Sequence, residues 1–282
     1  MSLSDYRFLP VSGLMFALIT LSGCSSRSNL PQPGTPAFYW QAARETFAAG
    51  DYTKTITALD SILDSDNEYT ARALPWSLVL ASGMASGYMA IADNYTFGAR
   101  ANRSDPSSFR TQASNNRAFA NRLALHFAEN FAKMDQLKDA NVALAFALPP
   151  GSAAEVVEFA KLGTGRVLLP AEVDSMQKRA IQRAVLLATC SAAGAPDDPA
   201  KTAQILSAPN NAQVPRATFM LAMAKALYDE SQLYTHDKLD DPDKMTIFCQ
   251  RAQDALKTVP ESKDTKDLTA KIQKVLKKSK KV

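Results

Sequence analysis

Apolar residues recur at helical spacing along almost the whole chain from residue 36 onward, and no run alternates apolar and polar residues as a half-buried strand does. Tyr52, Ile56, Leu59 and Leu63, for example, fall on one face of a helix. The breaks between such stretches are led by proline or glycine, and several are Asp-Pro pairs, which are typical helix starts. We therefore expect an all-α protein of about ten helices, arranged as antiparallel pairs stacked into a solenoid or a bundle.

These breaks also predict where the helices begin and end. The expected ranges are 36–49, 52–64, 73–92, 105–134, 137–148, 152–163, 173–193, 198–206, 216–234, 243–259 and 268–276. The sixth range opens on a capping box from Ser152 to Glu155 and stops at Gly163. The dipeptide before Gly151 is the expected internal boundary, which separates an N-terminal helical repeat region at 36–148 from a C-terminal one at 149–282.

The stretch from Ala73 to Ala92 carries no charge, so its composition admits two structures. Twenty such residues suffice to cross a hydrocarbon layer of about 30 Å, and Gly83-x-x-x-Gly87 resembles a contact motif of membrane helices. Small residues and a proline keep its hydropathy moderate, and small residues also let the helices of a soluble bundle approach closely. We expect the central helix of a soluble bundle.

The N-terminal sequence predicts an export signal. An apolar run from Phe8 to Thr20 is too short to span a bilayer and ends at Leu21-Ser22-Gly23-Cys24. That order resembles the lipobox of bacterial lipoproteins. The resemblance implies removal of residues 1–23, acylation of Cys24, a flexible linker at 24–35, and anchoring in the outer membrane facing the periplasm, since serines follow the cysteine. The alternative is an ordinary signal peptide in which Cys24 is incidental.

Two pairs of expected helices resemble tetratricopeptide units. In the first, Gly50-Asp51-Tyr52 separates two helices that carry Ala43, Phe47, Leu59 and Ile62 at the family's spacing. This unit departs from the pattern, because the family's small residue is Thr55 here and no proline closes the unit near Asn67. The second pair spans 216–234 and 243–259. The resemblance implies a helical scaffold that presents a surface to a partner.

A looser resemblance covers roughly Arg72 to Phe131. Ala73-Leu74-Pro75, then a helix of small residues, then a helix rich in arginine and aromatic residues, is similar to the T-component lipoproteins associated with TRAP transporters. The resemblance implies an accessory, ligand-handling role and assigns no ligand residues.

Charge is concentrated at the C-terminus. The chain carries a formal net charge of +4, but six lysines follow Asp267 with no acidic residue after it, so the rest is slightly acidic: Lys271, Lys274, Lys277, Lys278, Lys280 and Lys281. A nucleic-acid surface would need basic residues across one face, so we expect no nucleic-acid partner. The lysine tail either binds an anionic surface or is a solvated helix end whose charge suits the helix dipole.

Residues suited to catalysis or metal binding are sparse. The two histidines, His126 and His236, have no second ligand at metal spacing, and no nucleophile or phosphate-loop motif occurs. We expect no catalytic residue, no metal and no cofactor. If Cys24 is acylated, Cys190 and Cys249 remain, and they either form a disulfide or are two buried thiols.

Aromatic residues are the strongest indication of binding. They cluster in the first third of the chain, where they either line a groove between helices or belong to the core. The candidate groove residues are Tyr39, Trp40, Tyr52, Trp76, Tyr88 and Tyr95. We expect a lipid-anchored protein that binds another envelope protein, with the TRAP-associated role as the alternative.

Overall fold

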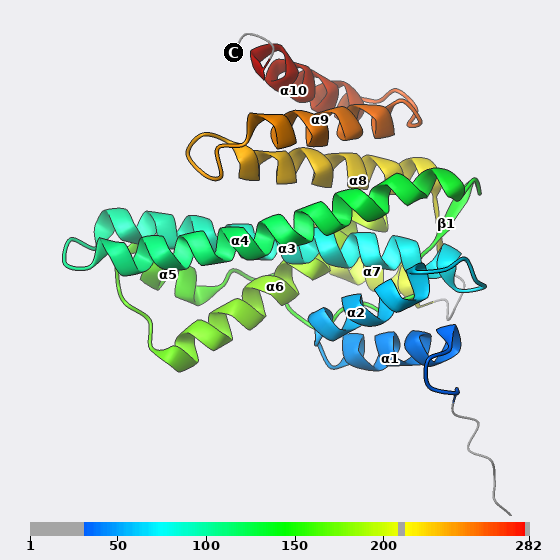
Figure 1. Ribbon diagram of the computed structural model, residues 1–282, viewed down its shortest axis with the longest axis horizontal. Coiled ribbons are helices and arrows are strands. Elements are labelled where there is room, and N and C mark those ends of the chain that lie inside the picture. Colours follow the sequence, from blue (N-terminus) through cyan, green and yellow to red (C-terminus); the bar gives the residue numbers. More distant parts are fainter. Residues whose placement is uncertain (1–30, 208–211, 280–282) are drawn as a thin grey trace, which may run out of the picture. The chain divides into compact units, whose positions relative to one another are not determined.

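A computed structural model describes residues 31–207 and 212–279, and within them the all-α prediction is confirmed. Ten α-helices form in these ranges (Figure 1). They are α1 Pro36–Ala48, α2 Tyr52–Leu63, α3 Thr70–Ala101, α4 Pro106–Phe131, α5 Val157–Gly163, α6 Pro170–Ala192, α7 Pro199–Leu206, α8 Arg216–Ser231, α9 Pro242–Leu256 and α10 Lys263–Ser279. Short 3-10 helices at Ala132–Gln136 and Gln232–Tyr234 continue α4 and α8.

The predicted helix starts are confirmed where a capping side chain precedes proline. Asp105 accepts a hydrogen bond from the backbone N–H of Ser108 at 3.1 Å, and Asp241 does the same for Lys244 at 3.0 Å. Each carboxylate satisfies an N–H group that has no partner inside the helix, and the proline that follows lacks one of these groups altogether. Local chemistry therefore places these starts.

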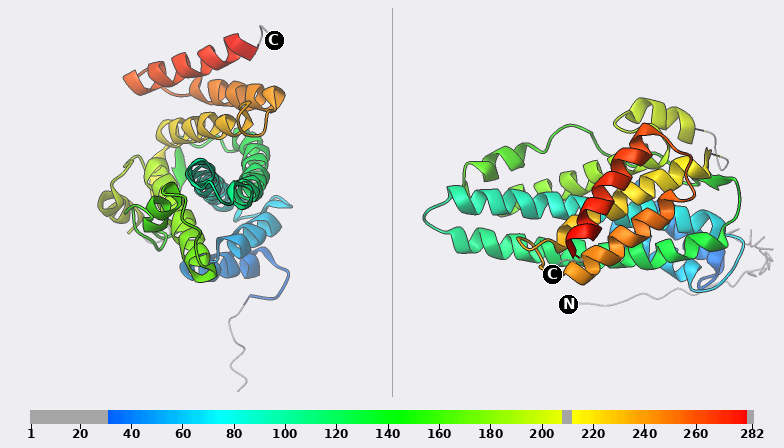
Figure 2. Two further views of the ribbon diagram at one scale, coloured as in Figure 1. Left: turned by 90° about the vertical axis from the view of Figure 1, so that its left-hand side faces the viewer. Right: turned by 90° about the horizontal axis from the view of Figure 1, so that it is seen from above.

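Helix α3 is the centre of the fold. It packs against α2, α4, α5, α6 and α8 (Figures 1 and 2). A Cβ atom on Gly83 would lie 2.7 Å from the Cα atom of Val185, and one on Gly87 would lie 3.0 Å from that of Ile181, so these glycines let α6 approach closely. Of the helices described, α3 alone is long and apolar enough to cross a membrane, and 83% of its apolar window is buried inside the protein.

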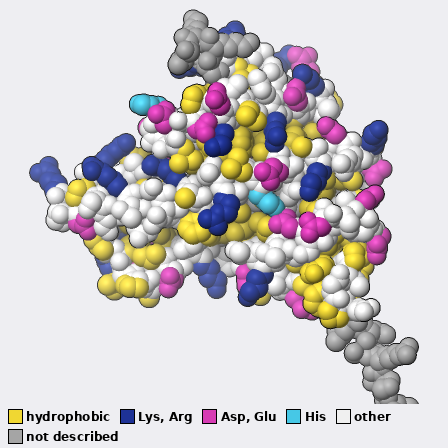
Figure 3. Space-filling view, in the orientation of Figure 1, with side chains coloured by type: hydrophobic (Ala, Val, Ile, Leu, Met, Phe, Trp, Pro, Cys, Tyr) yellow, Lys and Arg dark blue, Asp and Glu magenta, His cyan; other side chains and the backbone are white. Residues whose placement is uncertain are grey.

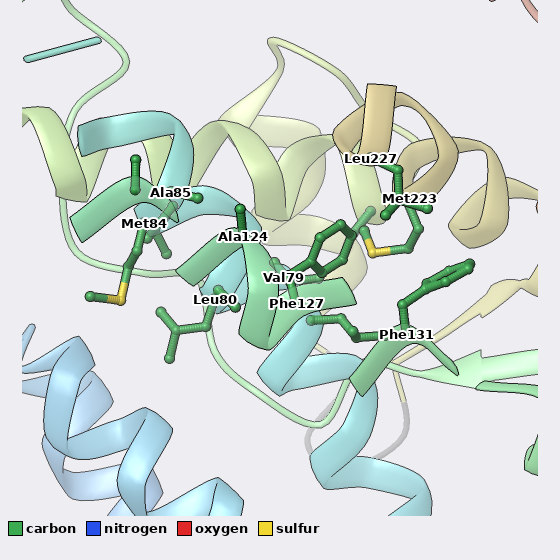
Figure 4. Packing of buried hydrophobic residues seen from close by; sticks show 14 of the residues in the cluster. Val79, Leu80, Met84, Ala85, Ala124, Phe127, Phe131, Met223 and Leu227 are labelled. Carbon is green, nitrogen blue, oxygen red and sulfur yellow. The ribbon is translucent and has the colours of Figure 1, made fainter. Parts of the chain in front are cut away.

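The core forms where α3, α4 and α8 meet (Figure 4). The ring of Phe127 on α4 is fully buried, and in Figure 4 it lies near side chains of α3 and α8. Neighbours shown with it are Val79, Leu80, Met84, Ala85, Ala124, Phe131, Met223 and Leu227. Helices adjacent in the chain pack in pairs, and α8, α9 and α10 stack one on another (Figure 1).

The prediction of a helix at 137–148 is wrong. Residues Asn141–Ala143 instead form strand β1, which pairs antiparallel with β2, Gln213–Pro215, and Leu144 extends the pairing by donating to Ala212 at 2.8 Å. The expectation that the chain holds no strand is therefore also wrong for this short ladder. In this stretch large apolar residues alternate with alanine, and since alanine is both apolar and helix-favouring, the alternation is masked.

The turn from Pro149 to Gly151 is not a boundary between compact units, because the chain from Pro31 onward forms one unit. The Tyr52 hydroxyl donates to the Pro150 carbonyl at 3.2 Å, which ties this turn to α2. The expected capping box does not open a helix: Ser152 accepts a hydrogen bond from the N–H of Ala154, and α5 begins only at Val157. Its end at Gly163 is as predicted.

Candidate functional site

A cleft of about 820 Å³ has mostly apolar walls, and we call it the aromatic cleft. Helix α1 forms one part of its wall, and the first turns of α3 form another part. The extended segment 144–147 and the C-terminal end of α7 complete it. Its large apolar side chains are Trp40, Phe47, Tyr69, Trp76, Leu144, Phe146 and Leu206.

Trp76 is the centre of the cleft's aromatic cluster. Its ring lies 5.4 Å from that of Trp40 and 5.1 Å from that of Phe47, both edge to face. It stacks on Phe146 at 5.5 Å, with ring planes inclined by 17°. Aromatic pairs at these separations each add about 0.5–1.5 kcal/mol beyond the area they bury. The contacts therefore pack the rings of this wall against one another.

The indole nitrogen of Trp76 is a buried hydrogen-bond donor. The residue is only 1% exposed, and among the described residues its indole N–H has no hydrogen-bond partner. Leaving a buried donor unpaired costs about 1–3 kcal/mol. The wall of the aromatic cleft thus holds unused hydrogen-bonding capacity.

Local structure explains how the cluster assembles. Trp40 and Phe47 are two turns apart on α1, so they share one helix face. Thr35 caps this helix by accepting from the N–H of Phe38 at 3.3 Å, and this cap sets the register. The rim of the cleft is polar: Gln41 donates to Glu45 at 2.8 Å, and exposed Arg44 lies between them in sequence. The cleft therefore has apolar walls and charges of both signs at its mouth.

The six aromatic residues predicted from the sequence do not line a single groove. Trp40 and Trp76 line the aromatic cleft, whereas Tyr52 and Tyr88 line a second cleft of about 430 Å³ between α2, α3 and α6. Tyr39 packs its ring against Phe38 at 5.5 Å, and Tyr95 is buried against Phe109 at 5.9 Å. Burial inside the core thus removes Tyr95 from any groove surface.

Three aromatic residues of the cleft were not predicted. Phe47 follows Trp40 by seven positions, a spacing that already puts both on one helix face. Tyr69 precedes α3, and its ring lies 5.5 Å from that of Trp40. Phe146 belongs to the segment that was expected to be helical, and only its alternation with alanine indicated an extended chain.

Cys190 and Cys249 are free, buried thiols and do not form a disulfide with each other. Cys190 on α6 interacts with Thr202 on α7, whereas Cys249 on α9 lies 3.5 Å from the Ser231 hydroxyl at the end of α8. Burial raises the pKa of both thiols, which keeps them protonated and poorly reactive. They pack in different helix pairs, so the folded chain does not pair them.

Glu230 is the most perturbed acidic residue of the described chain. It is fully buried near the end of α8, and neither carboxylate oxygen has a hydrogen-bond partner there. Burial, reinforced by the neighbouring Asp229 carboxylate, raises its pKa well above the usual value. Glu230 lines neither the aromatic cleft nor the cleft between α2, α3 and α6, so it faces no substrate in them.

The histidines lie apart from both clefts. His126 shares a hydrogen bond of 2.8 Å with Asp60, and exposed His236 lies 3.1 Å from Asp240. Within residues 31–207 and 212–279, no group of three or more His, Cys, Asp or Glu side chains is placed to hold a metal ion.

The predicted lipid site, Cys24, lies outside the described residues, as do the signal segment and most of the linker. Of the lysine tail, the part up to residue 279 belongs to α10, where Leu268 and Ile272 are buried and Lys274, Lys277 and Lys278 are exposed. Comparison of the chain with protein-family models, with curated proteins and with solved structures gave no match.

Proposed function

We propose that this chain is a lipid-anchored protein of the bacterial envelope whose helical body binds another protein through the aromatic cleft. The observation that carries the proposal is a wall of five aromatic side chains, in which Trp76 contacts three of the others and Tyr69 contacts Trp40. Aromatic anchors surrounded by polar groups are typical of the centres of protein interfaces, where a few residues supply most of the binding energy.

The exposed part of the cleft suits this role. Trp40 is only half-buried, so one portion of its ring is free to contact a partner while the rest is held by Tyr69 and Trp76. A side chain fixed in this way loses little conformational entropy on binding. Arg44 and Glu45 at the rim offer contacts of both signs, which favours a partner with polar groups around an apolar anchor.

A second candidate is supported by the size of the cleft. Small-molecule sites measure about 300–1,000 Å³, and the aromatic cleft, at about 820 Å³, lies within this range. This favours retaining the TRAP-associated alternative, in which the body handles a small ligand for a transporter.

Site-specific crosslinking distinguishes the two candidates. A photoreactive residue replaces Arg44 at the rim, and adducts formed in intact cells are analysed by mass. A protein adduct that disappears with Trp40→Ala supports the first candidate. Phe38→Ala is the matched control, because this exposed aromatic residue of the same helix does not line the cleft. A small organic molecule retained by the native protein and lost with Trp40→Ala supports the second, and absence of both contradicts both.

The anchor is tested separately. Cys24→Ala should release the folded body from the membrane fraction, because the acyl chains are proposed to be its only attachment, and the mature wild-type chain should carry the mass of the lipid. Cys249→Ala is the control and should remain attached. A wild-type chain without lipid, or a Cys24→Ala chain that stays bound to membranes, would contradict the anchor.

A further inference from the structure

A small pocket away from both clefts is lined by three arginines. It measures about 240 Å³ and lies in the groove between α3 and α4, where Asp237 of the loop before α9 also lines it. We call it the arginine pocket. Thr96, Ala99 and Arg100 come from α3, and Arg110, Ala113 and Arg117 come from α4. Figure 3 shows basic side chains gathered on the side of the molecule where the α3–α4 hairpin ends.

Helical spacing places these side chains together. Arg110, Ala113 and Arg117 follow one another at three and four positions, so they share one face of α4. The alanines leave room that larger residues would fill. Arg117 donates through Nη2 to the Thr96 hydroxyl at 2.9 Å, which holds its guanidinium across the groove, and its buried Nε–H has no partner among the described residues.

The positive charges of these arginines are only partly balanced. Within residues 31–207 and 212–279, none of the three lies within ion-pair distance of a carboxylate. Asp237 is the one acidic residue of the lining. A hydrogen bond from Thr235 lowers the pKa of Asp237, and Lys238 and Arg117 lower it further, so this carboxylate is ionised. The lining therefore holds three positive charges and one negative charge, which gives the pocket a net charge of +2.

Position in the helices does not explain all three arginines. Arg100 lies in the last turn of α3, where a cation is favoured by the helix dipole. Arg110 and Arg117 lie within α4, away from its C-terminal end, so the dipole gives no reason for them. A positively charged groove of this kind is instead what recognition of an anion requires.

We propose that the arginine pocket binds a doubly charged phosphate group. Guanidinium groups match the geometry of phosphate oxygens and remain charged at all relevant pH values. A phosphate dianion would neutralise the pocket, and the volume is below the range of drug-sized ligands, which suits a small group. The site is separate from the aromatic cleft and does not depend on the function proposed for it.

The phosphate belongs either to a lipid headgroup or to a free ion. The guanidinium of Arg100 lies 5.6 Å from the ring centre of Phe97, which is 58% exposed. Apolar surface therefore adjoins one of the arginines of the pocket, and the acyl part of a phospholipid would cover it. A free ion has no contact with Phe97, so this residue distinguishes the two sources.

The first test measures binding of inorganic phosphate to the full chain by calorimetry, at mildly alkaline pH where the dianion predominates. Removing one charged donor with Arg117→Gln should weaken binding about tenfold or more. Arg110→Gln should also weaken it, and since Arg110 is exposed this variant leaves the fold intact. Arg122→Gln is the matched control, because Arg122 lies on α4, outside the pocket lining, with its guanidinium over Phe119. Asp237→Asn should tighten binding severalfold by removing the like charge.

The second test uses a soluble short-chain phosphatidic acid as the probe. If the source is a lipid, this probe should bind more tightly than inorganic phosphate, and Phe97→Ser should weaken only the lipid. If the source is free phosphate, both probes should bind alike and Phe97→Ser should change neither. Absence of binding by both probes, or equal binding by the Arg110, Arg117 and Arg122 variants, would overturn the proposal.

Discussion

The indole of Trp76 stacks on the phenyl ring of Phe146, with the ring centres 5.5 Å apart, although the two residues come from a helix and from an extended segment that are distant in the chain. The contact joins α3 to the segment after β1. It also completes the wall of the aromatic cleft, because Phe47 packs on both rings, at 5.1 Å from Trp76 and 6.0 Å from Phe146. The stability of the fold and the form of the cleft thus depend on the same contact.

Phe146→Ala should lower the free energy of unfolding by about 3–5 kcal/mol, because a buried aromatic ring is lost and a cavity remains beside Trp76. Urea denaturation followed by circular dichroism measures the loss. Phe97→Ala is the control, since this exposed ring should change stability by no more than about 0.5 kcal/mol. Equal losses in the two variants would show that Phe146 is not packed in the core.

Gly83→Ala should destabilise the protein by about 1–3 kcal/mol through overpacking, despite the higher helix propensity of alanine. The added methyl group would lie 2.7 Å from the backbone of Val185, so α3 and α6 would have to separate. Gly163→Ala provides the control, because nothing lies within 4 Å of its Cβ position and alanine there should be neutral or stabilising. Thermal unfolding of both variants gives the comparison, and a stabilised Gly83→Ala protein would contradict the close approach of α6.

Because of Glu230, the free energy of unfolding should fall as the pH rises. Burial raises the pKa of Glu230 in the folded protein, so the folded state keeps a proton that the unfolded chain has already lost. Because the folded state binds more protons between the unfolded and the folded pKa, the free energy of unfolding decreases as pH increases through that window. Glu230→Gln cannot ionise and should be more stable than the wild type at neutral pH, by a margin that grows with pH.

Unfolding measurements from mildly acidic to mildly alkaline pH test this expectation. Glu261→Gln is the matched control, because the Glu261 side chain is 76% exposed and pairs with Lys266 on the surface. The free energy of unfolding of this variant should depend on pH in the same way as that of the wild type. Parallel profiles for Glu230→Gln and the wild type would show that the Glu230 carboxyl is not held in its protonated form.

Cys190 and Cys249 should both react with an alkylating reagent once the chain is unfolded without a reductant, and neither should react in the folded state. Both thiols are buried, and burial raises their pKa, so the reactive thiolate is scarce until the chain unfolds. Mass spectrometry of the labelled chain counts the modified sites. Labelling that requires prior reduction would reveal a disulfide in the native protein.

Only part of the arginine pocket can be predicted from the sequence. The spacing of Arg110, Ala113 and Arg117 places them on one face of α4 from sequence alone. That this face meets Thr96 and Arg100 depends on the packing of α4 against α3, and Asp237 joins them from a loop more than a hundred positions later. The sequence therefore indicated an arginine-rich helix without showing that it forms one wall of a pocket.

Helix starts and ends follow from interactions within a few residues, which is why caps such as Asp105 and Asp241 and stops such as Gly163 were predictable. Apolar spacing likewise determines which face of each helix is buried. The strand pair, the two clefts and the arginine pocket depend on contacts between distant segments. Phe146, for example, lines a cleft directly after the segment in which β1 pairs with β2, and no local signal contains that long-range pairing.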